Sequence, residues 1–201
     1  MSKHLLPIFL SGLVCAIPAS ANDIDQYVSE SRMLVQEFSQ SLKRELQRGM
    51  KAGGPVYAIG VCNVNAPQIS AELANKYGWE IGRTSLRIRN PGNSPDDWER
   101  HTLETFEERL LSGEKPADIE YYEVVQQDDD KVFRYMKAIP TVELCESCHG
   151  GALDKSVKQR LRELYPMDHA RGYRAGDIRG AFTFAKSLPA VVEVPAETDE
   201  Q

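Results

Sequence analysis

Apolar residues recur every three or four positions near the start of the chain, from Asp23 to about Gly49. The opposite positions carry charged residues such as Glu30 and Lys43. Because this period is that of one face of an α-helix, the pattern predicts one long amphipathic helix. We expect it to pack on the domain or on a second copy of the chain. The recurring positions are Ile24, Tyr27, Val28, Leu34, Val35, Phe38, Leu42 and Leu46.

Two short stretches after this helix have the composition of strands. Residues 56–62 form a continuous apolar run that ends at Cys62, which is typical of a buried strand. Residues 79–89 finish with apolar residues that alternate with arginines, as in a half-buried strand. Between these stretches, Pro67 in a first turn predicts a helix over about residues 65–76.

The second half of the chain alternates between helix and strand patterns. Five strand-like runs in the chain, with helices between them, predict one α+β domain with a mainly antiparallel sheet. The predicted elements of this half are a helix that begins at Ser94 and runs to about Leu111, strands over 119–125 and 132–139 joined as a hairpin, a helix over 155–164 and a last strand over 180–185.

The first residues have the pattern of a cleavable export signal. A charged start precedes an apolar run over residues 5–17, and small residues follow it. We therefore expect residues 1–21 to be removed, residues 22–189 to form the domain and the acidic residues 190–201 to form a mobile tail. The apolar run is shorter than a membrane span, so no transmembrane anchor is expected after cleavage. The formal net charge of -6 argues against nucleic acid as a partner.

Cys145, Cys148 and His149 form the sequence C-x-x-C-H, which is the attachment signature of a c-type haem. Cysteines at this spacing lie on one side of a helical turn, so both thiols can reach the vinyl groups of one porphyrin. The histidine that follows can then ligate the iron. A zinc site is not supported, because the chain has no second pair of ligands with zinc-type spacing. We predict one covalently attached haem c and, together with the export signal, a periplasmic location.

The second axial ligand of the iron has several candidates. Cys62 is the thiol left over in an oxidising compartment, although a lone cysteine is most often a small buried residue. His101 and His169 are expected at the surface and Met136 in the core, whereas Met167 would give the common His/Met pair. The residues alone leave the choice open. The candidates are Cys62, His101, His169, Met136, Met167 or no protein group.

Several short stretches, taken together, resemble the Tll-type c-haem domain family, which is a family of unknown function. The resemblance implies a PAS-like fold with a sheet of about five strands, flanking helices and a single c-type haem. It further implies His149 and Cys62 as the two axial ligands. Members fused to histidine kinases imply a sensor input, but this chain shows no kinase segment. The matching stretches are 58–62, 87–93, 95–99, 134–137, 145–150, 172–173 and 176–181.

Three functions are compatible with such a haem. Loss of Cys62 from the iron on reduction, or on binding CO or NO, would make a redox or diatomic-gas sensor that signals to a protein partner. If both ligands stay bound, the chain would be an electron carrier with a redox partner in the periplasm. A peroxidase-like enzyme needs an open distal position, which a bound Cys62 would block, so we expect no catalysis.

Three arginines are candidates to bind the haem propionates, namely Arg87, Arg89 and Arg179. Guanidinium groups bind carboxylates through two parallel hydrogen bonds, which suits this role. The alternative is that they are ordinary surface arginines. A homodimer formed through the N-terminal helix is a further expectation, since an amphipathic helix needs a surface to cover.

Overall fold

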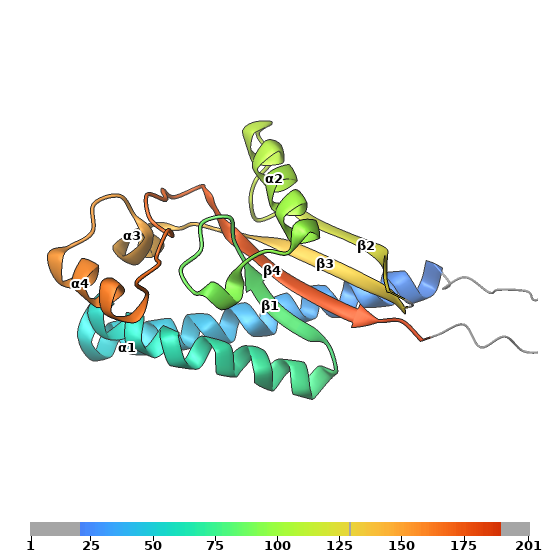
Figure 1. Ribbon diagram of the computed structural model, residues 1–201, viewed down its shortest axis with the longest axis horizontal. Helices are drawn as coiled ribbons and strands as arrows, with labels where there is room; N and C mark the ends of the chain where they lie inside the picture. Colours follow the sequence, from blue (N-terminus) through green and yellow to red (C-terminus); the bar gives the residue numbers. More distant parts are fainter. Residues whose placement is uncertain (1–20, 129, 190–201) are drawn as a thin grey trace, which may run out of the picture.

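The computed structural model describes residues 21–128 and 130–189, so the predicted signal peptide, apart from Ala21, and the predicted tail lie outside the described residues. Figure 1 shows a sheet with a hairpin of two long helical arms along one face and a shorter helix on the other. The elements are α1 (Ala21–Tyr77), β1 (Glu80–Thr84), the 3-10 turn η1 (Pro91–Asn93), α2 (Asp97–Leu111), β2 (Glu120–Gln127), β3 (Asp130–Pro140), α3 (Glu143–His149), α4 (Lys155–Leu164) and β4 (Ile178–Ser187).

The sheet confirms the α+β class and the antiparallel pairing, but it has four strands among the described residues instead of about five. Their order is β1-β4-β3-β2, so β1 and β2 form the edges. Alternate residues of the central strands face opposite layers: Phe133 and Tyr135 pack under α1, while Met136 packs under α2. The PAS-like arrangement stays a prediction.

The prediction of a strand over residues 56–62 is wrong, because this run is helical. α1 is a pair of helical arms that meet at Gly53 and Gly54, where Gly54 has φ +68. The chain reverses there, and Ala58 of the second arm lies so close to Gly49 of the first that a side chain on Gly49 would collide with it. The run is apolar because this arm is packed between neighbours, and such a run has no period that separates helix from strand.

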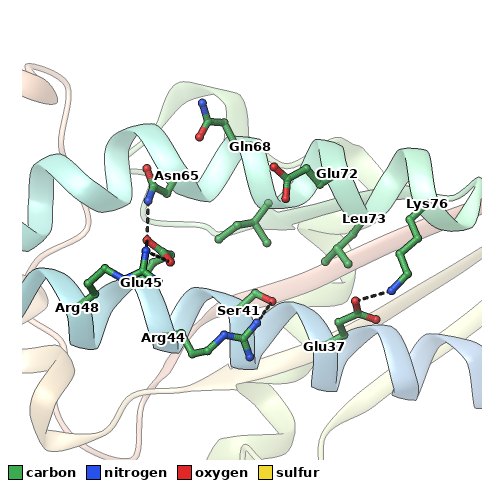
Figure 2. A pocket seen from close by; sticks show the side chains of 11 residues that line it. Glu37, Ser41, Arg44, Glu45, Arg48, Asn65, Gln68, Glu72, Leu73 and Lys76 are labelled. Carbon is green, nitrogen blue, oxygen red and sulfur yellow. Dashed lines mark hydrogen bonds and ion pairs between the residues drawn. The ribbon is translucent and has the colours of Figure 1, made fainter.

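A polar groove lies between the two arms of α1 (Figure 2). Polar contacts cross this groove: Lys76 lies 2.9 Å from Glu37, and the Asn65 amide lies 2.6 Å from Glu45. These contacts join the arms on the side away from the sheet, while leucines and aromatic residues join them to it. None of the described helices has a stretch long and apolar enough to cross a bilayer.

The predicted strand over residues 79–89 is observed only as β1, which ends at Thr84. The alternating residues that follow are not part of the sheet. Their backbone carbonyls are bound by other groups: Ile88 accepts from the His169 amide, and Arg87 accepts from the Ser85 hydroxyl. This segment therefore ties two distant parts of the chain together, a role that an alternating pattern does not reveal.

The remaining elements follow the predictions, with shifted ends. The β2–β3 hairpin is confirmed, and α4 has the predicted bounds of Lys155–Leu164. The cap of α2 is Asp96 and not Ser94, because Asp96 and Glu99 form a reciprocal capping box. Pro67, predicted at the start of a helix, lies inside the second arm of α1.

Candidate functional site

The C-x-x-C-H motif forms the short helix α3, which follows directly from the central strand β3. Thr141 holds the junction by bonding through its amide to Asp177 and through its carbonyl to Gly176, both in the turn before β4. Cys145 and Cys148 are free thiols and are partly buried. Cys148 packs against an apolar cluster that joins the second arm of α1 to α4, namely Ile59, Leu153, Val157 and Leu161.

The imidazole of His149 is partly buried and held by hydrogen bonds. Its Nδ1 lies 2.9 Å from the carbonyl oxygen of Ala170, and its Nε2 lies 3.4 Å from Nη1 of Arg89. Both contacts fit the tautomer in which Nδ1 carries the proton and donates to Ala170, while the lone pair of Nε2 accepts from Arg89. The Arg179 Nε–H, 3.1 Å from Nδ1, fits only the other tautomer. The first tautomer is the one that leaves Nε2 available to a metal.

Burial and neighbouring charges keep this imidazole neutral. Burial lowers the pKa of His149 well below its ordinary value, and the guanidinium groups of Arg179 and Arg89 lower it further. The ring of Tyr173 packs edge-on against the imidazole, with ring centroids 6.2 Å apart. A neutral, fixed imidazole is the form in which histidine ligates iron or zinc.

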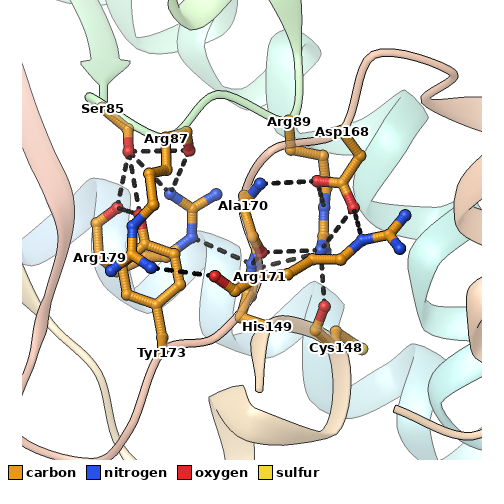
Figure 3. Close-up of polar contacts among 10 residues, drawn as sticks. All are labelled: Ser85, Arg87, Arg89, Cys148, His149, Asp168, Ala170, Arg171, Tyr173 and Arg179. Carbon is orange, nitrogen blue, oxygen red and sulfur yellow. Dashed lines mark hydrogen bonds and ion pairs between the residues drawn. The ribbon is translucent and has the colours of Figure 1, made fainter. Parts of the chain in front are cut away.

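Arg89 is the centre of the polar contacts beside this histidine (Figure 3). Its Nη2 donates to the carbonyl oxygens of Cys148 at 2.6 Å and Ala170 at 3.2 Å, and its Nε lies 3.0 Å from the carboxylate of Asp168. The Asp168 side chain is fully buried and also binds Arg171. Arg89 therefore fixes the backbone carbonyls of Cys148 and Ala170 beside His149, a role that the sequence did not predict. Its contact with a haem propionate stays a prediction.

Arg179 and Arg87 lie on the other side of the imidazole, around Tyr173. The guanidinium of Arg87 stacks on the Tyr173 ring at 3.7 Å from its centroid, and that of Arg179 lies at 5.1 Å. Arg179 also donates to the Ser85 hydroxyl at 3.0 Å. The structure thus brings all three predicted arginines to one place, with Arg87 the most exposed of them.

Cys62 reaches the same neighbourhood from the second arm of α1. Burial raises the pKa of its thiol, while the positive charges of Arg83 and Arg89 lower it. Cys62 in turn raises the pKa of the Cys148 thiol, so the two sulfurs are electrostatic neighbours. The sequence places these residues 86 positions apart, and the fold brings them together through the packing of α1 against α3 and α4.

The other candidate ligands are placed away from this site or at the surface. His101 and His169 are exposed, and Met167 is 67% exposed. Met136 is fully buried in the core under α2, as predicted for a packing residue. No group of three or more His, Cys, Asp or Glu side chains suited to a metal ion occurs in the ranges 21–128 and 130–189.

Sequence reasoning missed four residues of the site, namely Arg83, Asp168, Ala170 and Tyr173. One signal pointed to the first of them. Residues 81–94 contain three arginines and no acidic residue, in a chain that is acidic as a whole. Such a segment requires anions from elsewhere in the fold or from a ligand.

Comparisons with known proteins show the family and the fold of the chain. No curated protein sequence matches the chain. The crystal structure of the cyanobacterial haem protein Tll0287 superposes on it with a TM-score of 0.58 at 19% sequence identity, covering 90% of this chain and 100% of that one. The family model described as Tll0287-like matches residues 20–187. The chain therefore belongs to the Tll0287-like family.

Proposed function

We propose that this chain carries one haem c, attached through Cys145 and Cys148, with His149 and Cys62 as its axial ligands. It acts in the periplasm as a redox or diatomic-gas sensor. The observation that supports the proposal best is the meeting of three features: the attachment motif, a neutral histidine held by its Nδ1, and a distant thiol beside them. The haem protein Tll0287, which has a similar fold, adds support.

The residues around His149 fit an anionic cofactor of this kind. The charges of Arg83 and Arg89 lower the pKa values of both Arg179 and Cys62, so these cations lie close together. Among the described residues, the buried carboxylate that pairs with one of the three arginines is Asp168, which binds Arg89. Thr141, next to the motif, has a buried hydroxyl without a hydrogen-bond partner. Surplus cations and an orphaned donor in one place match the propionates of a haem and a thiolate ligand.

Each residue has a separable role in this proposal. Bound haem would supply an iron that takes up one electron and binds diatomic gases. His149 is oriented by Ala170, which fixes its Nε2, and Arg89 holds the backbone carbonyls of Cys148 and Ala170 on either side. Cys62 supplies electron density from its sulfur, which favours ferric iron and a low reduction potential.

A sensor also needs an element that can shift, and the second arm of α1 is suited to this. It carries Cys62, it is separated from the first arm by Gly53 and Gly54, and its Ser70 hydroxyl bonds to the carbonyl of Ile81 in β1. If Cys62 leaves the iron, the arm loses its link to the haem while its contacts with β1 and α4 remain. A change at the iron would thereby reach the edge of the sheet.

The test is a set of optical and EPR spectra of the haem-loaded protein, oxidised and reduced, with and without CO. We expect a low-spin ferric signal with thiolate-type g values that disappears in Cys62→Ser, and CO uptake after reduction. Met167→Leu is the matched control and should leave every spectrum unchanged. A Cys62→Ser spectrum identical to that of the wild type, or a midpoint potential well above zero, would overturn the ligand assignment.

Electron transfer is the second candidate, and one observation favours it. Val142 and Leu144, which shortly precede the first cysteine of the motif, are 53% and 43% exposed. Exposed apolar side chains at this point offer a contact surface for a redox partner near the haem edge. If reduced protein binds no CO and keeps the thiolate signature in both oxidation states, this function replaces sensing.

A further inference from the structure

Arg83 is a partly buried arginine of β1 that the sequence did not single out. It faces the α1 side of the sheet, where its guanidinium lies 5.8 Å from the centroid of the Phe38 ring. Burial lowers its pKa, and Cys62 and Tyr165 oppose that effect. Arg83 thus stands among the apolar core, the candidate distal ligand and a tyrosine at the end of α4.

The local geometry explains why Arg83 reaches the level of Cys62. The second arm of α1 and β1 run antiparallel after the turn at Gly78 (Figure 1), and the bond between Ser70 and Ile81 fixes their relative position. From that bond, Cys62 lies eight residues back along a helix and Arg83 two residues on along a strand. At about 1.5 Å and 3.3 Å per residue, the remaining offset is about the length of an arginine side chain.

The charge of Arg83 has no protein counter-charge. Within residues 21–128 and 130–189 the Arg83 guanidinium makes no ion pair and no side-chain hydrogen bond. By contrast, Arg89 is paired with Asp168 and Arg134 with Asp96. A partly buried guanidinium without an anion is costly. An anion that appears only in the haem-loaded protein would remove that cost.

We propose that Arg83 is a positioning residue that holds the Cys62 thiolate against the haem iron. This inference rests on the proposed His149 and Cys62 ligation. Arg83 compensates the negative charge of the bound sulfur. Ferrous iron neutralises less of that charge than ferric iron does, so the compensation matters most in the reduced protein. Without this cation the thiolate is buried uncompensated, so Cys62 leaves ferrous iron more readily.

The test is CO titration of the haem-loaded, reduced full chain. When CO replaces the sulfur, the Fe–S bond breaks, an Fe–C bond forms, the sulfur keeps its electron pair and the iron stays ferrous. Arg83→Gln and Arg83→Met remove the charge, and the second keeps an apolar stem against Phe38. Both should raise the apparent CO affinity about tenfold or more. Arg83→Lys keeps the charge and should stay near the wild type.

The same substitution in a Cys62→Ser background separates two explanations. If Arg83 acts through Cys62, Arg83→Gln changes the CO affinity of Cys62→Ser by less than about twofold. An equal increase in both backgrounds would show that Arg83 acts on the haem itself, and an unchanged affinity in the single variants would show no role at all. Either result overturns the inference. Failure of the proposed ligation is seen separately, as an unchanged ferric spectrum of Cys62→Ser.

Discussion

Two charged regions of this molecule are built in opposite ways. In the Glu120 network, one carboxylate receives several donors: Arg32 at 2.5 Å, the Tyr135 hydroxyl at 2.7 Å and Lys137 at 3.7 Å. In the His149 pocket, His149 lies with Arg87, Arg89, Arg179 and Asp168 (Figure 3), and Arg83 is near enough for its charge to lower the pKa of Arg179, so the cations outnumber the anions. The Glu120 network is complete within the chain, while the His149 pocket is not.

The difference shows which region serves stability and which serves a ligand. A carboxylate surrounded by donors lowers the free energy of the folded chain without help from outside. Guanidinium groups gathered around a neutral histidine do the reverse, because their mutual repulsion and burial oppose folding. Sites that are costly in this way are characteristic of function. The two regions should therefore respond differently to substitution.

The largest effect is expected for Asp168→Asn. This change leaves Arg89 without its buried carboxylate and takes an acceptor from Arg171 and from the amide of Ala170. We expect a loss of about 3 kcal/mol in the free energy of unfolding, measured with urea on the haem-loaded chain. Glu163→Gln, which breaks an exposed pair with Arg160, is the control and should leave the free energy of unfolding nearly unchanged. Equal losses in the two variants would mean that another group compensates the charge of Arg89 when the Asp168 carboxylate is removed.

A somewhat smaller effect is expected for Gly180→Ala at the other side of the pocket. Gly180 has φ +154, and a side chain there would collide with the carbonyl of Thr84. The substitution should separate the end of β1 from β4 and displace Ser85 from Arg179, at a cost of about 2 kcal/mol by thermal unfolding. Gly176→Ala, at φ +97 with open space around it, is the control and should cost about 1 kcal/mol. A smaller loss at Gly180 than at Gly176 would contradict this account.

The sequence predicted the parts of the fold that local signals determine. The hairpin, α4 and the amphipathic first arm of α1 each carry their own period or turn residues. Residues 56–62 were misread because the buried residues among them, Ala58 and Ile59, pack on the first arm of α1 and on α4, and not in a sheet. The segment after β1 was misread because its alternating arginines serve the His149 pocket. In both places tertiary contacts override the local pattern.

The candidate site divides in the same way. Cys145, Cys148 and His149 are contiguous, so their spacing alone indicates their chemistry. Asp168 and Tyr173 stand in a loop where a carboxylate and an aromatic ring look ordinary, and only the fold turns them toward His149. No pattern of residues near Arg83 or Asp168 could have shown which of them finds a partner within the chain.

A more modest loss is expected for Tyr135→Phe in the Glu120 network. The Tyr135 side chain is fully buried, and the change removes one donor from Glu120 while Arg32 and Lys137 remain. The free energy of unfolding should fall by about 1 kcal/mol, as for a typical single hydrogen bond. Urea unfolding with and without haem should give the same loss, because this region is complete without a ligand. A loss that differs with and without haem would show that the Glu120 network and the His149 pocket are energetically coupled.

The smallest effect is a change in pH dependence caused by Glu120→Gln. Burial raises the pKa of Glu120, but the hydrogen bonds from Arg32 and Tyr135 outweigh it, so that the pKa lies below the ordinary value of 4.5. A carboxyl whose pKa is lowered on folding stabilises the protein above its unfolded pKa, and this contribution is lost as the pH falls through the folded pKa. The difference in unfolding free energy between wild type and Glu120→Gln should therefore shrink between pH 5 and pH 3, by less than about 1 kcal/mol. Urea unfolding at several pH values measures it, and a constant difference would show that the Glu120 network does not draw its stability from the charge of its carboxylate.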